Sequence, residues 1–110
     1  MIIAIPVSAG SVSAHFGHCE EFRFFEVKEG AISAQYERTP PAHEPGVLPR
    51  WLHQQGADVI ITGGMGQRAR DLFHQISIKT VTGISGEAPE QAAAQYINGT
   101  LLAGENPCDH

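Results

Sequence analysis

Five short stretches of the chain carry the hydrophobic patterns typical of β-strands. Residues 2–7 are wholly apolar and residues 58–62 largely so, which suits strands buried on both faces of a sheet. Residues 22–28 and 31–38 alternate apolar and polar positions around a Glu-Gly turn, which predicts a hairpin. Residues 78–82 form a further strand, so we expect a five-stranded sheet.

Three segments with helical spacing separate or follow the later strands. Apolar residues recur at helical spacing from about residue 46 to Gly56, and Pro49 fits there only in the first turn. A second helix is expected from the glycines at 63–66 to about His74, and an Ala-rich helix over 87–98. The resulting order, strand, hairpin, and then helices alternating with strands, predicts an α/β fold.

The order of the strands follows from general rules of connection. Strands adjacent in sequence tend to pair, and strand–helix–strand crossovers are right-handed. These rules predict a mixed sheet of order 3-2-1-4-5, numbered along the chain, with helices on both faces. Ligands in open α/β sheets favour the crevice where the strand order reverses. The loops at 8–19, 39–46 and 63–66 are therefore expected around one site, and the first, which has no regular period, is expected to be unstructured and mobile.

Length and charge narrow the class of protein. The 110 residues predict one domain, residues 1–99, followed by a tail at 100–110. A net charge of −5 argues against nucleic-acid binding, which needs clustered cations. The apolar start has no basic flank and is too short to cross a membrane. We therefore expect a cytoplasmic protein without membrane contact, either a monomer or a weak homodimer.

Histidine and cysteine side chains gather at two places in the chain. The first loop contains His15, His18 and Cys19, and the chain ends in Cys108-Asp-His110. Imidazole and thiolate groups are ligands for zinc, copper(I) and iron–sulfur clusters. These residues are candidate metal ligands, together with His43 in the loop at 39–46. The alternatives are a turn-capping histidine, a cysteine packed at the core edge, an exposed loop histidine and a tail without a binding role.

A glycine loop follows the strand at 58–62. It contains Gly64-x-Gly66-x-x-Ala69, which fits a short dinucleotide fingerprint, but no Lys-Ser/Thr of a P-loop follows. Glycines allow close approach to a ligand, a helix N-terminus attracts anions, and Arg68 adds positive charge. The loop therefore indicates either an anion site or tight packing of helix on sheet. A nucleotide- or phosphate-binding regulatory module is the alternative function.

The ordered run of motifs resembles the dinitrogenase iron–molybdenum cofactor biosynthesis family over essentially the whole chain. The motifs are IAIPV at 3–7, HFGHC at 15–19, ERTP at 37–40, GADVI at 56–60, GGMG at 63–66 with RA at 68–69, and NGTL at 98–101. The resemblance implies a ribonuclease-H-like, three-layer α/β/α domain. It also implies a carrier of an iron–sulfur or molybdenum-containing cluster rather than an enzyme, with cluster donor and acceptor proteins as partners. The candidate cofactor-binding residues are Ser13, Gly17, Gly63, Gly64, Met65, Gly66 and Arg68.

Overall fold

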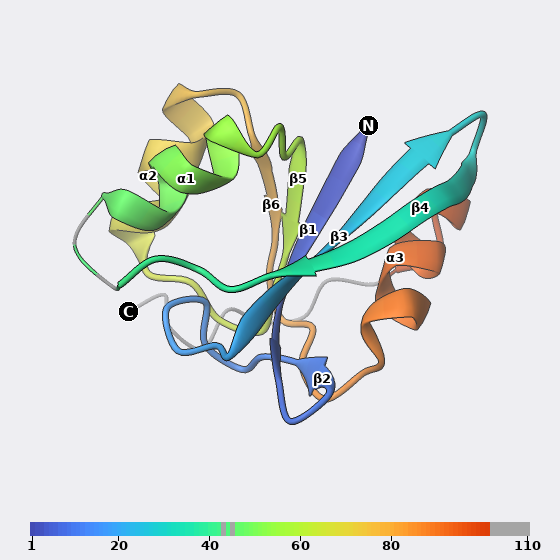
Figure 1. Ribbon diagram of the computed structural model, residues 1–110, viewed down its shortest axis with the longest axis horizontal. Coiled ribbons are helices and arrows are strands. Elements are labelled where there is room, and N and C mark those ends of the chain that lie inside the picture. The colour runs from blue at the N-terminus through green and yellow to red at the C-terminus, as the bar shows by residue number, and fades with distance from the viewer. Residues whose placement is uncertain (43, 45, 102–110) are drawn as a thin grey trace.

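The computed structural model describes residues 1–42, 44 and 46–101, and all structural statements below concern these residues. The fold has three layers, with a central sheet between helices on its two faces (Figure 1). The strands are β1 (Ile2–Ser8), β2 (Ser11–Val12), β3 (Glu21–Lys28), β4 (Ala31–Arg38), β5 (Val59–Ile61) and β6 (Lys79–Val81). The helices are α1 (Val47–Gln54), α2 (Gln67–Gln75) and α3 (Pro89–Asn98).

The sheet is mixed and runs in the order β4-β3-β1-β5-β6, with β2 paired to β1 beside this path. β3 pairs antiparallel with β1 and with β4, whereas β1, β5 and β6 are parallel. The expected mixed α/β fold is therefore confirmed. The parallel strands β5 and β6 have only three residues each, shorter than the apolar runs that predicted them.

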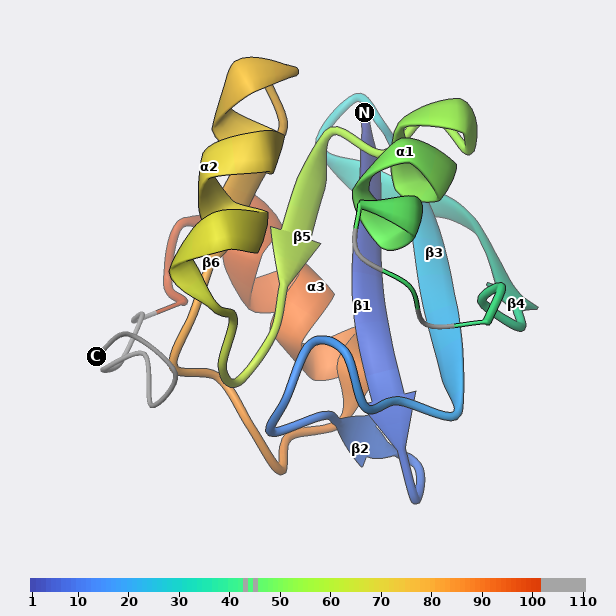
Figure 2. The same cartoon turned by 90° about the vertical axis from the view of Figure 1, so that its left-hand side faces the viewer.

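Each face of the sheet carries its own hydrophobic core. Helices α1 and α2 cover one face, whose core includes Phe22, Phe24 and Ile60. Helix α3 covers the other, whose core includes Phe25 and Ile5 (Figure 2). Consecutive side chains of a strand point to opposite faces, so the adjacent residues Phe24 and Phe25 of β3 pack into different cores. These two apolar residues interrupt the alternation of β3 because the strand is buried on both faces.

The segment after β1 is more ordered than its sequence predicts. The expectation of an unstructured loop over 8–19 is wrong for residues 11–12, which form β2 and bring the sheet to six strands. Ala9 and Gly10 both have positive φ and make the tight turn, and Val12 then pairs with Val7. Two-residue turns with left-handed backbone suit antiparallel hairpins, so a short hairpin forms without a strand-like pattern.

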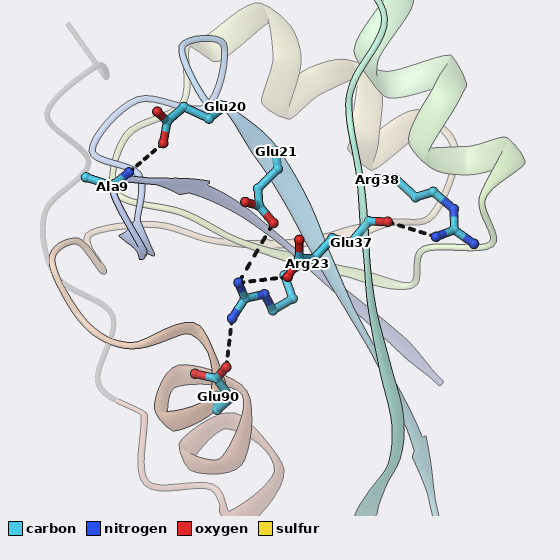
Figure 3. A network of polar contacts seen from close by, with 7 residues as sticks. All are labelled: Ala9, Glu20, Glu21, Arg23, Glu37, Arg38 and Glu90. Atoms are coloured by element: carbon cyan, nitrogen blue, oxygen red, sulfur yellow. Dashed lines mark hydrogen bonds and ion pairs between the residues drawn. The ribbon is translucent and has the colours of Figure 1, made fainter.

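Helix α3 is tied to the hairpin by an arginine (Figure 3). Arg23 on β3 donates from Nη1 to Glu90 on α3 at 2.7 Å and from Nη2 to Glu37 on β4 at 3.3 Å. The same guanidinium lies 3.8 Å from Glu21. Desolvation and the neighbouring Glu37 carboxyl raise the pKa of the Glu21 carboxyl. This cluster of charges lies on the α3 side of the sheet.

The helices are short, as expected of a small α/β domain. Pro49 occupies the third position of α1, within the first turn, as its sequence position required. The longest described helix, α3, has ten residues, and no described helix is long and apolar enough to cross a membrane.

Gly63 stands where two loops come into direct backbone contact. Its N–H donates to the Ser13 carbonyl at 2.9 Å. A Cβ at residue 63 would lie 2.7 Å from the Cα of Ala14 and 2.8 Å from the Ser13 carbonyl oxygen, closer than real Cβ atoms pack. This glycine therefore supports the tight-packing interpretation of the glycine loop at this one position.

We expect Gly63→Ala to destabilise the fold by about 1–3 kcal/mol, since the backbone of residues 13–14 must shift. For a domain of this size, that change lowers the melting temperature by several degrees. Gly66→Ala is the matched control, because a Cβ there meets nothing within 4 Å and φ is −63°. Thermal denaturation followed by circular dichroism measures both, and equal melting temperatures for the two variants would contradict the packing argument.

Candidate functional site

A pocket of about 410 Å³ lies where the loops after β1 and β5 meet the first turns of α1 and α2. We call it the loop–helix pocket. Its lining residues are His15, Phe16, Gly17, His18, Glu44, Gly46, Leu48, Pro49, Gly64, Gly66, Arg68, Ala69 and Leu72. It lies beside the junction of β1 and β5, where the strand order reverses. Ligands of open α/β sheets favour that position.

The structure brings six of the predicted site residues to this pocket. The first loop supplies His15, Gly17 and His18, and the second supplies Gly64, Gly66 and Arg68. The two imidazole rings are perpendicular, with centroids 6.2 Å apart, and both histidines are exposed. Arg68 is also exposed, on the first turn of α2. Two histidines and an arginine thus line the same pocket.

Buried hydroxyl groups hold the turn that carries the histidines. Ser13 is 4% exposed, and its Oγ donates to the His15 carbonyl at 2.9 Å. The same oxygen lies 3.3 Å from the His15 amide, which donates to it. The Ser8 hydroxyl donates to the His18 carbonyl at 3.2 Å. The Ser13 hydroxyl therefore positions the turn by bonding to backbone groups of His15. Ser13 itself does not line the pocket.

Phe16 anchors the same turn in the core. Its ring is 6% exposed and packs edge-on against Phe22 and Phe73, with centroids 5.8 and 5.4 Å apart. The backbone continues this anchoring, since His15 forms a parallel bridge with Gly64 and the Phe16 amide donates to the Gly64 carbonyl at 2.8 Å. Figure 2 shows this segment beside the loop joining β5 to α2. The histidines thus stand on a fixed turn.

Two helix N-termini open onto the pocket. Helix α1 begins after Gly46 and α2 after Gly66, and neither has a side-chain cap or an acidic residue in its first turn. In α1 the Val47 amide donates to the Glu44 carbonyl and Pro49 has no N–H, so α2 supplies most of the first-turn N–H groups that have no partner within their own helix. The helix dipole adds partial positive charge at both ends, and together with Arg68 the start of α2 favours a negatively charged ligand. The Glu44 carboxylate on the pocket lining partly opposes this charge.

Cys19, Met65 and Gly63 lie outside the pocket lining. Met65 is 1% exposed and belongs to the core beneath α1 and α2, and Cys19 is half-buried against the same core. Desolvation by burial, with a smaller contribution from the charge of Glu21, raises the pKa of the Cys19 thiol to about 11. A thiol rather than a thiolate therefore stands at this position at neutral pH.

Three predicted metal ligands, His43, Cys108 and His110, lie outside the described residues. Within the described part, no three His, Cys, Asp or Glu side chains converge in a set that could hold a metal ion. The apolar wall made by Phe16, Leu48 and Leu72 was not predicted as part of the site. Leu48 and Leu72 have only the helical spacing that predicted their helices, and Phe16 lies in the first loop, where no period marks it.

The structure is thus a mixed α/β domain with a pocket beside the point where its strand order reverses. The chain belongs to the dinitrogenase iron–molybdenum cofactor family, whose model matches residues 1–99. The resemblance drawn from the sequence motifs is thereby confirmed.

Three individual proteins are similar to this chain in sequence or in fold. An uncharacterised protein of Methanocaldococcus jannaschii, MJ0580, is 31% identical over 83 residues, which cover 71% of this chain and 70% of that protein. The crystal structure of PH0822 is similar with a TM-score of 0.86 at 30% identity, over 94% of both chains. The apo form of the orange protein from Desulfovibrio gigas has the same fold, with a TM-score of 0.78 at 22% identity over 96% and 94% of the two chains.

The raised pKa of Cys19 predicts slow alkylation at neutral pH. Only the thiolate reacts, and a shift of the pKa from its usual 9.0 to about 11 lowers the thiolate fraction at neutral pH about one hundredfold. With Cys108 replaced by alanine, the rate of reaction with iodoacetamide should rise with pH to a midpoint near 11. A midpoint near 9 would show that the Cys19 thiol is not desolvated.

Proposed function

We propose that the loop–helix pocket binds a preformed, negatively charged metal–sulfur cluster as cargo, containing iron or molybdenum. The observation that carries the proposal is the pairing, in one pocket, of two exposed imidazoles with Arg68 and the N-terminus of α2, which has no side-chain cap. Family membership supports the same class of cargo. Imidazole nitrogens are suitable metal ligands, and the positive wall suits the charge of the sulfides.

The donor set suits a preformed cluster better than a bare metal ion. A bare ion such as zinc needs about four protein ligands, and the described residues contain no group of three. A preformed cluster brings its own sulfides, so it needs few protein ligands and gains from hydrogen-bond donors and positive charge. Cys19 lies off the pocket lining, so it is less favourably placed as a ligand than the two histidines.

The proposed role is that of a carrier without catalysis, which receives the cluster from a donor protein and passes it to an acceptor. Reversible holding is favoured by exposed ligands at an open pocket, since a partner can reach them. The ribonuclease-H-like class that the resemblance implies stays a prediction, which the strand order β4-β3-β1-β5-β6 supports.

A nucleotide or phosphate is the competing ligand, because the uncapped start of α2 and Arg68 would also bind a phosphate group. The two histidines favour the cluster, since a phosphate site has no need of soft metal ligands. Absorption spectra of the loaded protein separate the two, since a cluster absorbs in the visible range and a nucleotide does not.

Removing a histidine from the pocket should weaken cluster uptake. The cluster-free protein is incubated anaerobically with iron and sulfide, or with molybdate and sulfide, and its visible absorption and bound metal are measured. We expect His18→Ala and His15→Ala to lower affinity by about tenfold or more, at least the loss typical of an outer-shell partner of a metal. Cys19→Ser should have a smaller effect, because the thiol lies outside the pocket.

The matched control is His74→Ala, which removes an exposed histidine from the last turn of α2, away from the pocket. It should load like the unchanged protein. Full uptake by a His15→Ala, His18→Ala double variant would refute the cluster site, and binding of phosphate or nucleotide alone would favour the competing ligand.

The candidate ligands at the C-terminus lead to a separate prediction about cluster release. Cys108 and His110 repeat the chemistry of the first loop, and we expect them to slow cluster release. Deleting residues 107–110 should leave the melting temperature unchanged, because no member of either core is lost. Release to a chelator should become faster while loading is little affected. Equal release rates for the truncated and full chains would remove the tail from the mechanism.

A further inference from the structure

A second hollow, of about 280 Å³, lies between α1 and α2, and we call it the helix groove. Gly46, Pro49 and Leu72 line both this groove and the loop–helix pocket, so the two hollows adjoin. The floor of the groove is apolar, since Pro49 is buried and Leu72 and Ile76 are half-buried. A partner lying in the groove would therefore reach the edge of the pocket.

The rim of the helix groove is polar and cationic. Its exposed side chains are Arg50, His53 and Gln75. The described residues provide no ion-pair partner for Arg50. By contrast, Arg23 on the other face of the sheet is surrounded by three glutamates.

Positive and negative residues are distributed unequally between the helix pair α1 and α2 and the rest of the chain. Helices α1 and α2 carry three arginines and one aspartate, and that aspartate, Asp71, accepts a 2.8 Å hydrogen bond from Gln67. The rest of the chain carries four Lys or Arg against eleven Asp or Glu. The helix pair thus carries a net charge of +2 on a protein with net charge −5, and Arg50 is the arginine that lines the helix groove.

We propose that the helix groove docks an acidic segment of the protein that donates or accepts the cluster, with one apolar side chain of that segment lying on the floor between Pro49 and Leu72. The proposal rests on the proposed carrier function. Opposite charge on the two partners speeds their encounter and fixes their orientation, while a buried apolar anchor holds the complex. The shared residues then place the docked segment beside the cluster.

Other occupants fit the surface less well. A nucleic acid needs several clustered cations along its backbone, and the three arginines lie on a chain that is otherwise strongly acidic. A second copy of the chain carries the same net charge of −5, and the repulsion between the two copies opposes their association. A short acidic segment of another protein can contact the helix pair alone.

The test uses the full chain without cluster and a heptapeptide probe of six glutamates around a central leucine. Amide chemical shifts measured at millimolar peptide should change along α1 and α2, and the binding should weaken as salt is added. Replacing the central leucine by serine should weaken binding through loss of the anchor, and a peptide with lysines in place of the glutamates should not bind. Arg50→Glu should weaken binding by about fivefold to tenfold, equivalent to about 1.0–1.4 kcal/mol.

Lys28→Glu is the matched control, because it makes the same change of charge at an exposed site at the end of β3, away from the groove. It should leave peptide binding nearly unchanged. Arg50→Glu should still take up cluster normally, since Arg50 does not line the loop–helix pocket. Because peptide binding is measured without cluster, failure of the carrier function would not by itself abolish it.

Four results would overturn the proposal. They are no shifts on α1 or α2 at millimolar peptide, equal weakening by Arg50→Glu and Lys28→Glu, tighter binding of an oligothymidylate than of the peptide, and sedimentation showing self-association that Arg50→Glu abolishes. The last two would assign the groove to a nucleic acid or to a second copy, respectively.

Discussion

The arrangement of the pocket depends on a backbone contact between residues 13–16 and residues 63–64. Two backbone hydrogen bonds join these loops, from the Gly63 amide to the Ser13 carbonyl and from the Phe16 amide to the Gly64 carbonyl, and the second belongs to the parallel His15–Gly64 bridge. The chain reaches this contact after β2, so residues 13–16 lie beside the segment that follows β5, although β1 itself ends at Ser8. The contact requires glycine at position 63, because a Cβ there would overlap the backbone of residues 13–14. As a result, the turn that carries the histidines lies against the start of α2.

Much of the fold could be predicted because the hydrophobic pattern records burial directly. The apolar run at 2–7 is buried on both faces, and the hairpin over residues 22–38 forms beside it. β2 could not be predicted, because it consists of two residues paired by a turn and carries no hydrophobic period. The predicted strands over 58–62 and 78–82 each run one residue past both ends of β5 and β6, because hydrophobic patterning does not fix where ladder pairing stops.

The site was predictable in location but not in detail. Topology places the loops after β1 and β5 together, and chemistry marks His15, His18 and Arg68 within them. In a loop, the sequence does not show which of two neighbouring side chains faces the pocket and which faces the core. Cys19 and Met65 were therefore grouped with residues that line the pocket, although both pack against the core. Which neighbour faces the pocket depends on the turn held by Ser13, and that turn has no sequence period.

The same turn combines rigid support with accessible ligands. Its buried members, Ser13 and Phe16, fix the backbone, while His15 and His18 stand exposed. In the proposed carrier, a fixed turn lowers the entropy lost on binding, and exposed ligands leave the cluster open to a competing acceptor. The half-buried Cys19 lies off the pocket lining, so the pocket itself offers imidazole, amide and guanidinium groups. These groups hold a cluster less tightly than a thiolate ligand does, which suits its transfer to an acceptor.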